Sequence, residues 1–144
     1  MREPRWVPRV VVDATHLDQL REHGGLSGVR DENAEAALSR PRQKWHYSSD
    51  VDLATLAAAY AFGLTRAHAF SDGNKRISFL AAMIFLGLNG KELNASEVEV
   101  VQVMVALAEG LLDEAQLAEW FRPRIVRVGL WSPHHEKSPS RPLS

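Results

Sequence analysis

Two apolar segments that follow one another closely constrain the fold more than any other feature of this chain. From Leu53 to Leu64, large apolar side chains recur at the three- and four-residue intervals of an α-helix, with alanines between them. This pattern predicts a helix over 50–67. The segment from Ile77 to Leu88 is apolar on nearly every side, which predicts a central helix buried by its neighbours. Together the two segments indicate a mainly α-helical protein.

Capping and stop signals predict four further helices. Asp, Asn or Thr marks a helix start and Gly or Pro marks an end, and these signals bound the segments 13–24, 31–41, 94–110 and 113–123. In the helix predicted over 94–110, four apolar residues are expected to face the core: Val98, Val101, Val105 and Leu107. Residues 40–49 lack helical spacing, and the alternation of Trp45 and Tyr47 with polar residues suits a short strand. We therefore expect an all-α, compact single-domain bundle with one possible short β segment.

Composition narrows the class of protein. A chain of 144 residues is about one domain, and the prolines and serines after Arg127 predict a flexible tail over 126–144 behind a domain of 1–125, whose core spans about 13–122. The net charge of −1 gives no basic field, so no direct nucleic-acid partner is expected. The chain has no cysteine and no apolar run of the roughly 18 residues that a membrane span needs. We expect a cytoplasmic protein without a membrane partner.

The polar stretch between the two apolar segments, His68 to Arg76, contains the residues suited to chemistry. Its end, Gly73 to Arg76, is expected to form the first turn of the central helix, where unpaired backbone N–H groups attract anions. Gly73 allows a phosphate to approach the backbone closely. Lys75 and Arg76 are cations at the positive end of a helix dipole, an arrangement that costs roughly 0.3–1 kcal/mol unless an anion is bound. The stretch therefore predicts a phosphate site.

The first half of the stretch supplies a base and a carboxylate. The imidazole of His68 can accept a hydroxyl proton near neutral pH, and Asp72 can bind the Mg²⁺ that accompanies nucleotide phosphates. Phe70 is expected to anchor the loop in the core. Each residue also has a structural interpretation, since Asp72 is a good helix cap and a lone His68 is more often solvent-facing. The combination of residue types in this order favours function. The other histidines show no metal-ligand spacing: His16, His23, His46, His134 and His135.

The sequence His68-Ala69-Phe70-Ser71-Asp72-Gly73-Asn74-Lys75-Arg76 resembles the signature of the Fic/Doc family, His-Pro-Phe-x-Asp/Glu-Gly-Asn-Gly/Lys-Arg. Ala69, in place of proline, is the one departure at an informative position. Three further stretches are similar to the death-on-curing (Doc) branch: Gly24 to Asp31, Leu38 to Pro41 and Leu86 to Gly90. The resemblance covers roughly His16 to Phe121. It implies a bundle of helices with the motif between two central ones, as the apolar pattern also predicts.

The resemblance implies a role for each motif residue. His68 would deprotonate a target hydroxyl, and Asp72 would position Mg²⁺. The phosphates of ATP would be held by the Gly73 amide with Asn74, Lys75 and Arg76. The segment from Arg40 to Tyr47 matches the place of the family's flap, which aligns the target polypeptide by strand pairing. The flap residues that would contact the target are Arg42, Lys44, Trp45 and Tyr47.

Two departures from the family pattern bear on the reaction. Many Fic members transfer AMP to a protein hydroxyl, whereas Doc toxins transfer the γ-phosphoryl group of ATP to a threonine of elongation factor Tu and inhibit translation. AMP-transferring members usually have glycine where this chain has Lys75, and a second arginine where it has Phe79 and Leu80. Both departures favour the Doc-type kinase, with AMP transfer as the alternative and a catalytically silent binding module as a second one. The family's self-inhibiting helix motif is not found, so inhibition by a cognate antitoxin is expected.

Overall fold

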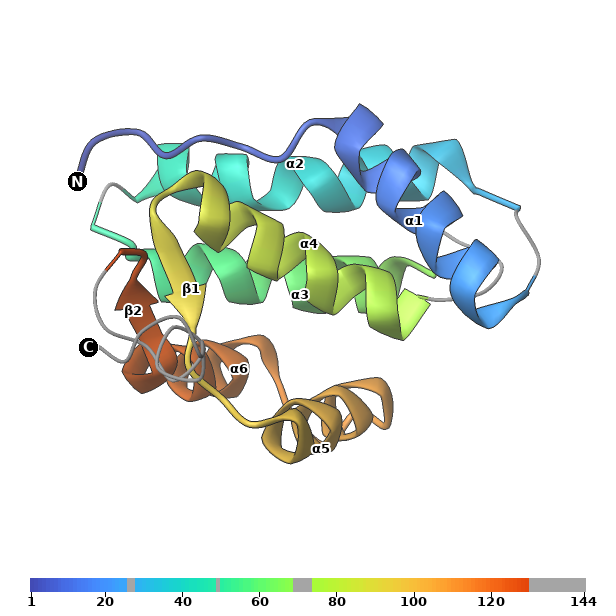
Figure 1. Ribbon diagram of the computed structural model, residues 1–144. Coiled ribbons are helices and arrows are strands. Elements are labelled where there is room, and N and C mark those ends of the chain that lie inside the picture. The colour runs from blue at the N-terminus through green and yellow to red at the C-terminus, as the bar shows by residue number, and fades with distance from the viewer. Residues whose placement is uncertain (26–27, 49, 69–73, 130–144) are drawn as a thin grey trace.

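The protein is a bundle of α-helices with one short two-stranded ribbon, as the sequence predicts (Figure 1). The computed structural model describes residues 1–25, 28–48, 50–68 and 74–129, the side chains of Asn74 and Lys75 excepted. In chain order the elements are α1 (Arg9–His23), α2 (Asp31–Tyr47), α3 (Leu53–Ala67), α4 (Asn74–Leu88), β1 (Lys91–Leu93), α5 (Glu97–Ala108), α6 (Glu114–Phe121), the 3₁₀ turn η1 (Arg122–Arg124) and β2 (Ile125–Arg127). The expected all-α class is confirmed.

Helix α3 is the centre of the bundle. It packs against α2, α4 and α6, and most of its residues are buried, many of them alanines that let these helices approach closely (Figure 1). Its N-cap is Asp52, whose side chain accepts a hydrogen bond from the Thr55 backbone N–H at 2.9 Å. Helix α4, which the apolar pattern predicts to be the central one, has partly exposed positions at Met83 and Leu88. The alanine-rich helix therefore takes the innermost place.

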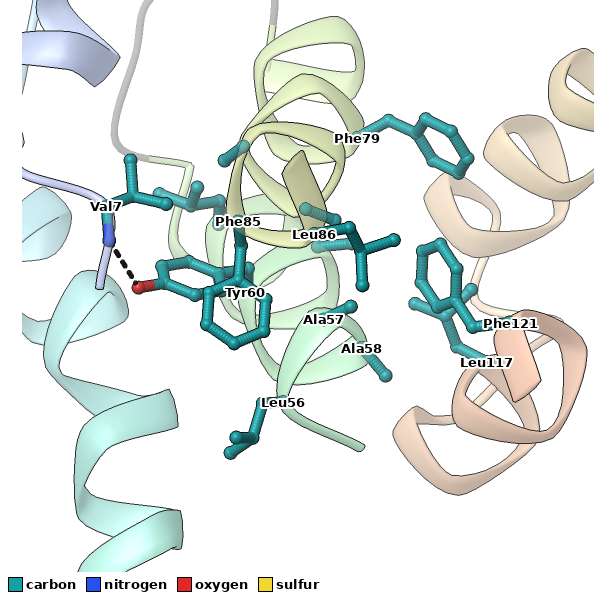
Figure 2. Packing of buried hydrophobic residues seen from close by; sticks show 14 of the residues in the cluster. Val7, Leu56, Ala57, Ala58, Tyr60, Phe79, Phe85, Leu86, Leu117 and Phe121 are labelled. Carbon is teal, nitrogen blue, oxygen red and sulfur yellow. Dashed lines mark hydrogen bonds between the residues drawn. The ribbon is translucent and has the colours of Figure 1, made fainter. Parts of the chain in front are cut away.

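Aromatic packing fills both sides of the α3–α4 pair (Figure 2). On one side, the rings of Tyr60 and Phe85 lie 5.0 Å apart, and the Val7 backbone N–H donates a 3.0 Å hydrogen bond to the Tyr60 hydroxyl. Burial raises the pKa of Tyr60, so the phenol stays neutral while it accepts this bond. On the other side, Phe79 of α4 stacks on Phe121 of α6, with ring centroids 5.8 Å apart. The core thus joins the N-terminal segment, the central pair and α6.

Helix α2 corrects two predictions. Pro41 does not stop the helix but lies inside it, and the segment 40–49, where a short strand was expected, is helical up to Tyr47. A proline in a helix interior costs about 3 kcal/mol, because it removes a hydrogen bond and crowds the preceding turn. Here the Pro41 ring is fully buried, and Ala37 and Ala34 are buried one and two turns earlier in the same helix. Burial of this face offsets the cost of the proline.

Helix α1 also differs from its prediction. It begins at Arg9 behind Pro8, four residues before the start of the predicted segment 13–24. The Arg9 side chain donates hydrogen bonds of 2.7 and 2.8 Å to Asp31 and Glu35 of α2. Gly24, with φ of 77°, ends the helix as predicted.

The C-terminal third corrects a prediction about α5. Its capping box is formed by Ser96 and Glu99, and the buried side consists of Val103 and Leu107. Val98, Val101 and Val105, expected to face inward, are 65%, 57% and 38% exposed, since α5 packs on one side only, against α4 and α3. Helix α6 begins at the predicted cap, Asp113.

The two-stranded ribbon contains the last element of the described chain, β2. Strands β1 and β2 pair in antiparallel fashion, with Leu93 opposite Ile125 and Lys91 opposite Arg127. The strand therefore extends two residues beyond the expected domain end at 125. Within the described residues, no helix is long and apolar enough to cross a membrane.

Candidate functional site

The motif connects the two central helices, α3 and α4, at one end of the bundle (Figure 1). His68 follows the last residue of α3, and Asn74, Lys75 and Arg76 form the first turn of α4. Phe70, Asp72 and Gly73 lie outside the described residues, so their predicted roles stay predictions. The side chains that the structure describes at the motif are those of His68 and Arg76.

His68 is held by its backbone. It is the C-cap of α3, in the left-handed conformation with φ of 50° and ψ of 46°, which is uncommon for a residue other than glycine. Arg30 Nη1 donates a 2.8 Å hydrogen bond to the His68 carbonyl, and Asn33 Nδ2 donates one of 2.8 Å to the Ala67 carbonyl. The last carbonyls of a helix have no internal partner, so these bonds satisfy them. We refer to Arg30 and Asn33 as the backbone clamp.

The clamp was not predicted from the sequence as part of the site. Arg30 and Asn33 lie 38 and 34 residues before the carbonyls that they contact, so no periodicity or local motif links them to His68. The one available signal was the similarity of the segment Gly24 to Asp31 to the Doc branch, which includes Arg30 but assigns it no contact. The imidazole that the clamp positions is exposed, so a protein hydroxyl could reach it.

Arg76 provides an unsatisfied donor in the first turn of α4. Its side chain is partly buried, and its Nε atom is buried without a hydrogen-bond partner among the described residues. Such a group costs about 1–3 kcal/mol, more when charged, unless a ligand satisfies it. A phosphate oxygen is a fitting acceptor, because the free N–H groups of the same turn attract anions. The arrangement of this turn therefore suits the phosphate-binding role expected for Arg76.

A buried hydrogen bond joins α3 and α4 just behind the motif. The Thr65 hydroxyl donates to the Ser78 hydroxyl at 2.6 Å, and both side chains are buried. Thr65 is one turn before His68 and Ser78 is two residues after Arg76. The bond therefore sets the spacing of the two helices close to the residues that would act on substrate.

The predicted flap residues do not form one surface. All four lie on α2, where the Arg42 guanidinium stands over the Trp6 ring at 5.7 Å and Trp45 is partly buried. Lys44 Nζ lies 3.3 Å from a carboxylate oxygen of Glu114, and Tyr47 is 96% exposed. Lys44 and Tyr47 line the same hollow, whereas Arg42 lines a different one. Of the four residues, Lys44 and Tyr47 are the two that line a common hollow. A target-docking role for the four stays a prediction.

The described residues do not test the expected magnesium site. Asp72, the expected ligand, lies outside them, and no group of three or more His, Asp or Glu side chains that could hold a metal is found in the described part of the chain. Of the expected ligands, the described residues thus bear on Arg76 alone, and its geometry suits a phosphate.

The fold and the sequence together define a helical-bundle protein with the motif His68 to Arg76 between its two central helices, and comparison with known proteins assigns its family. The sequence model of the Fic/DOC family matches residues 6–86, which include the whole motif. The chain is 32% identical over 110 residues to "Protein kinase doc" of Escherichia phage P1, covering 76% of this chain and 86% of that protein. It is 44% identical over 75 residues to "Toxin Doc" of Mycolicibacterium smegmatis (strain ATCC 700084 / mc(2)155), covering 50% of this chain and 57% of that protein. This protein belongs to the Fic/DOC family.

Proposed function

We propose that this protein is a Doc-type toxin that transfers the γ-phosphoryl group of ATP to a hydroxyl of a target protein. The observation that carries the proposal is the similarity to the phage P1 protein named as a kinase, which extends over 86% of that protein's length. The exposed His68 and the unsatisfied Nε of Arg76, at the two ends of one short connection, support it.

In the proposed reaction, His68 accepts the proton of the target hydroxyl as its oxygen attacks the γ-phosphorus. The bond from that phosphorus to the β–γ bridging oxygen breaks, and ADP leaves with the electron pair. Arg76, Lys75, Asn74 and the Gly73 amide hold the phosphates, so that the acceptor and the γ-phosphorus meet in line. A Mg²⁺ ion, proposed to be held by Asp72, would neutralise phosphate charge.

The position of Phe79 favours phosphoryl transfer over AMP transfer. Phe79 and Leu80 stand where family members that transfer AMP usually carry a second arginine, and the Phe79 ring is buried against Phe121 of α6. That face of α4 is thus committed to the core. Without a cation there, the nucleotide phosphates lose one contact, which supports a different placement of the nucleotide and attack at the γ position.

The identity of the target and the presence of an antitoxin are proposed from the resemblance to Doc toxins. The target hydroxyl is proposed to be a threonine of elongation factor Tu, so that transfer inhibits translation in the cytoplasm. A cognate antitoxin is proposed to neutralise the protein, which accords with relatives that are named as a toxin and a kinase of the Doc type.

Mass spectrometry of elongation factor Tu after incubation with the protein, ATP and Mg²⁺ tests the reaction. We expect a gain of one phosphate on a threonine, lost in His68→Ala and kept in His23→Ala, which alters an exposed histidine of α1. A gain of AMP instead would support the alternative activity. If the target gains neither group, the purified protein binds no nucleotide and cells tolerate it without an antitoxin, the protein is a binding module and the proposal fails.

A further inference from the structure

A continuous cleft follows the seam between α2 and α3, and we refer to it as the α2–α3 cleft. One hollow of about 590 Å³ is lined by Asn33, Arg40, Gln43, Arg66 and Ala67, among others. A second, of about 440 Å³, shares Arg40 and Gln43 with the first and extends to Tyr47 and Val51. One end of the cleft is lined by Ala67, the residue before the proposed base His68.

The cleft is positively charged although the chain is not. Arg40, Lys44 and Arg66 line the two hollows, and no Asp or Glu of the described residues does. Arg40 and Lys44 share a single carboxylate at the edge, that of Glu114. Arg66 makes no ion pair with any described residue, and its guanidinium lies over the Phe62 ring at 5.1 Å. The cleft therefore keeps an excess of cations in a chain whose net charge is −1.

Small residues also line the cleft between its cations, among them Ala36, Ala37 and Gly63. Pro41 has no N–H to donate, so the Ala37 carbonyl lacks its usual partner one turn later in α2. This carbonyl would lie 3.6 Å from a Cβ placed on Gly63, so it faces the seam with α3. The Arg40 side chain comes closer still to that position, with its Cδ atom at 3.2 Å, so this cation lies across Gly63 in the cleft.

We propose that the α2–α3 cleft binds an acidic, extended segment of the protein substrate and leads its acceptor hydroxyl to His68. This inference rests on the proposed function. The cleft follows α3, which at 1.5 Å per residue is about 22 Å long, enough for about six or seven extended residues. The cations would pair with carboxylates of the segment, and the Gln43 amide with its backbone. A nucleic acid fits less well, because the face of Phe62 on which a base would stack is covered by Arg66.

Binding of a fluorescein-labelled octaglutamate peptide to the full-length protein, followed by fluorescence anisotropy at low salt, tests the cleft without requiring catalysis. We expect Arg66→Glu to weaken binding by about ten-fold or more, and Arg66→Lys to change it by less than about three-fold. Arg66→Gln, which puts no carboxylate beside Phe62, should weaken it in the same direction. The matched control is Arg21→Glu, which reverses the charge of an exposed arginine on α1. It should leave the affinity for the peptide within about two-fold of the wild-type value.

Kinetics on the protein substrate separate this inference from the proposed function. Arg66→Glu should raise the KM for the protein substrate while kcat and the KM for ATP stay close to wild type. If wild type transfers no group to any protein, the proposed function fails, and peptide binding still decides whether the cleft takes an acidic chain. The inference is overturned if wild type does not bind the peptide, if Arg21→Glu weakens binding as much as Arg66→Glu, or if an oligothymidylate of equal charge binds more tightly than the peptide.

Discussion

Asp52 shows how much a single residue can contribute to this fold. Its carboxylate caps α3 through the Thr55 N–H at 2.9 Å, accepts from the Thr55 hydroxyl at 2.8 Å and receives Arg122 Nε at 2.6 Å. The Arg122 guanidinium holds the pKa of Asp52 well below its usual range. One side chain thus joins the start of the central helix to the segment that follows α6.

Asp52→Asn is expected to destabilise the protein in a pH-dependent way. Asparagine keeps a cap acceptor but loses the charge that pairs with Arg122, and because Asp52 is 49% exposed we expect a loss of only about 1 kcal/mol at pH 7. The folded-state pKa is lowered, so the carboxylate stabilises the fold above the unfolded value of about 3.9, and this contribution is lost as the pH falls below it. Urea unfolding at pH 7 and pH 3 measures the difference.

The control for that prediction is Asp18→Asn, an exposed aspartate on α1 whose nearest cation lies 3.8 Å away. It should change the free energy of unfolding by less than about 0.5 kcal/mol at either pH. If the Asp52→Asn difference were equally large at pH 3 and pH 7, the charge would not be its source.

At the scale of elements, the C-terminal end of α3 depends on the N-terminal end of α2. The backbone clamp of Arg30 and Asn33 satisfies the last two carbonyls of the helix where the chain turns into the motif. The left-handed conformation of His68 is one that a non-glycine residue keeps only when its surroundings hold it. The clamp is such a restraint, and it acts on the backbone of the proposed base.

Loss of the clamp should reduce transfer more than it reduces stability. For Arg30→Ala and Asn33→Ala we expect kcat to fall by about ten-fold, because small displacements of a catalytic group are costly, while the KM for ATP changes little. The free energy of unfolding should fall by about 1 kcal/mol for each variant. Arg30→Lys keeps a donor and should recover part of the rate. Steady-state kinetics, with an NMR comparison of the His68 backbone amide shift, measure both effects.

Glu32→Ala is the matched control for the clamp, since Glu32 is exposed and lies on α2 between the two clamp residues. It should leave kcat and the His68 amide shift unchanged. A clamp variant that loses stability but keeps both the rate and the amide shift would show that Arg30 and Asn33 serve the fold alone.

At the scale of the whole molecule, the two ends of the described chain meet at the turn that follows α4. The Arg5 backbone N–H donates to Asn89 Oδ1 at 2.8 Å, and the Val128 N–H donates to the Gly90 carbonyl at 2.8 Å. The N-terminal segment is further fixed by Val7 on Tyr60, and β2 pairs with β1 directly after the turn. Both ends of the described chain are therefore bound to the turn after α4, at the end of the bundle opposite His68 and Arg76 (Figure 1).

Two truncations test this closure. A chain ending at Arg124 loses β2, so β1 loses its hydrogen-bonded partner and the buried Leu93 is exposed to solvent. Its Tm should fall by about 5 °C or more. A chain ending at Gly129 keeps the strand and should keep the Tm, as expected if the part of the predicted tail beyond the ribbon does not stabilise the fold. Circular dichroism melts measure both. Equal Tm values for the two truncations would contradict a stabilising role for β2, and a lowered Tm for the longer one would contradict the tail prediction.

The sequence alone determined the parts of this protein that depend on neighbours in the chain. The helical spacing of Leu53 to Leu64, the apolar segment after Arg76 and the cap at Asp113 predicted helices that the structure contains. The contiguous motif from His68 to Arg76 indicated the Fic/Doc family, which the comparisons confirm. Caps, periodicity and motifs are local, so a single sequence can display them.

Only the tertiary structure decided what depends on residues far apart in the chain. Whether Pro41 ends a helix or lies inside one depends on the face that buries its ring, and which valines of α5 are covered depends on how many helices pack on it. The backbone clamp and the α2–α3 cleft exist because α2 lies beside α3. Contacts of this kind are made by packing, which no local pattern in either helix records.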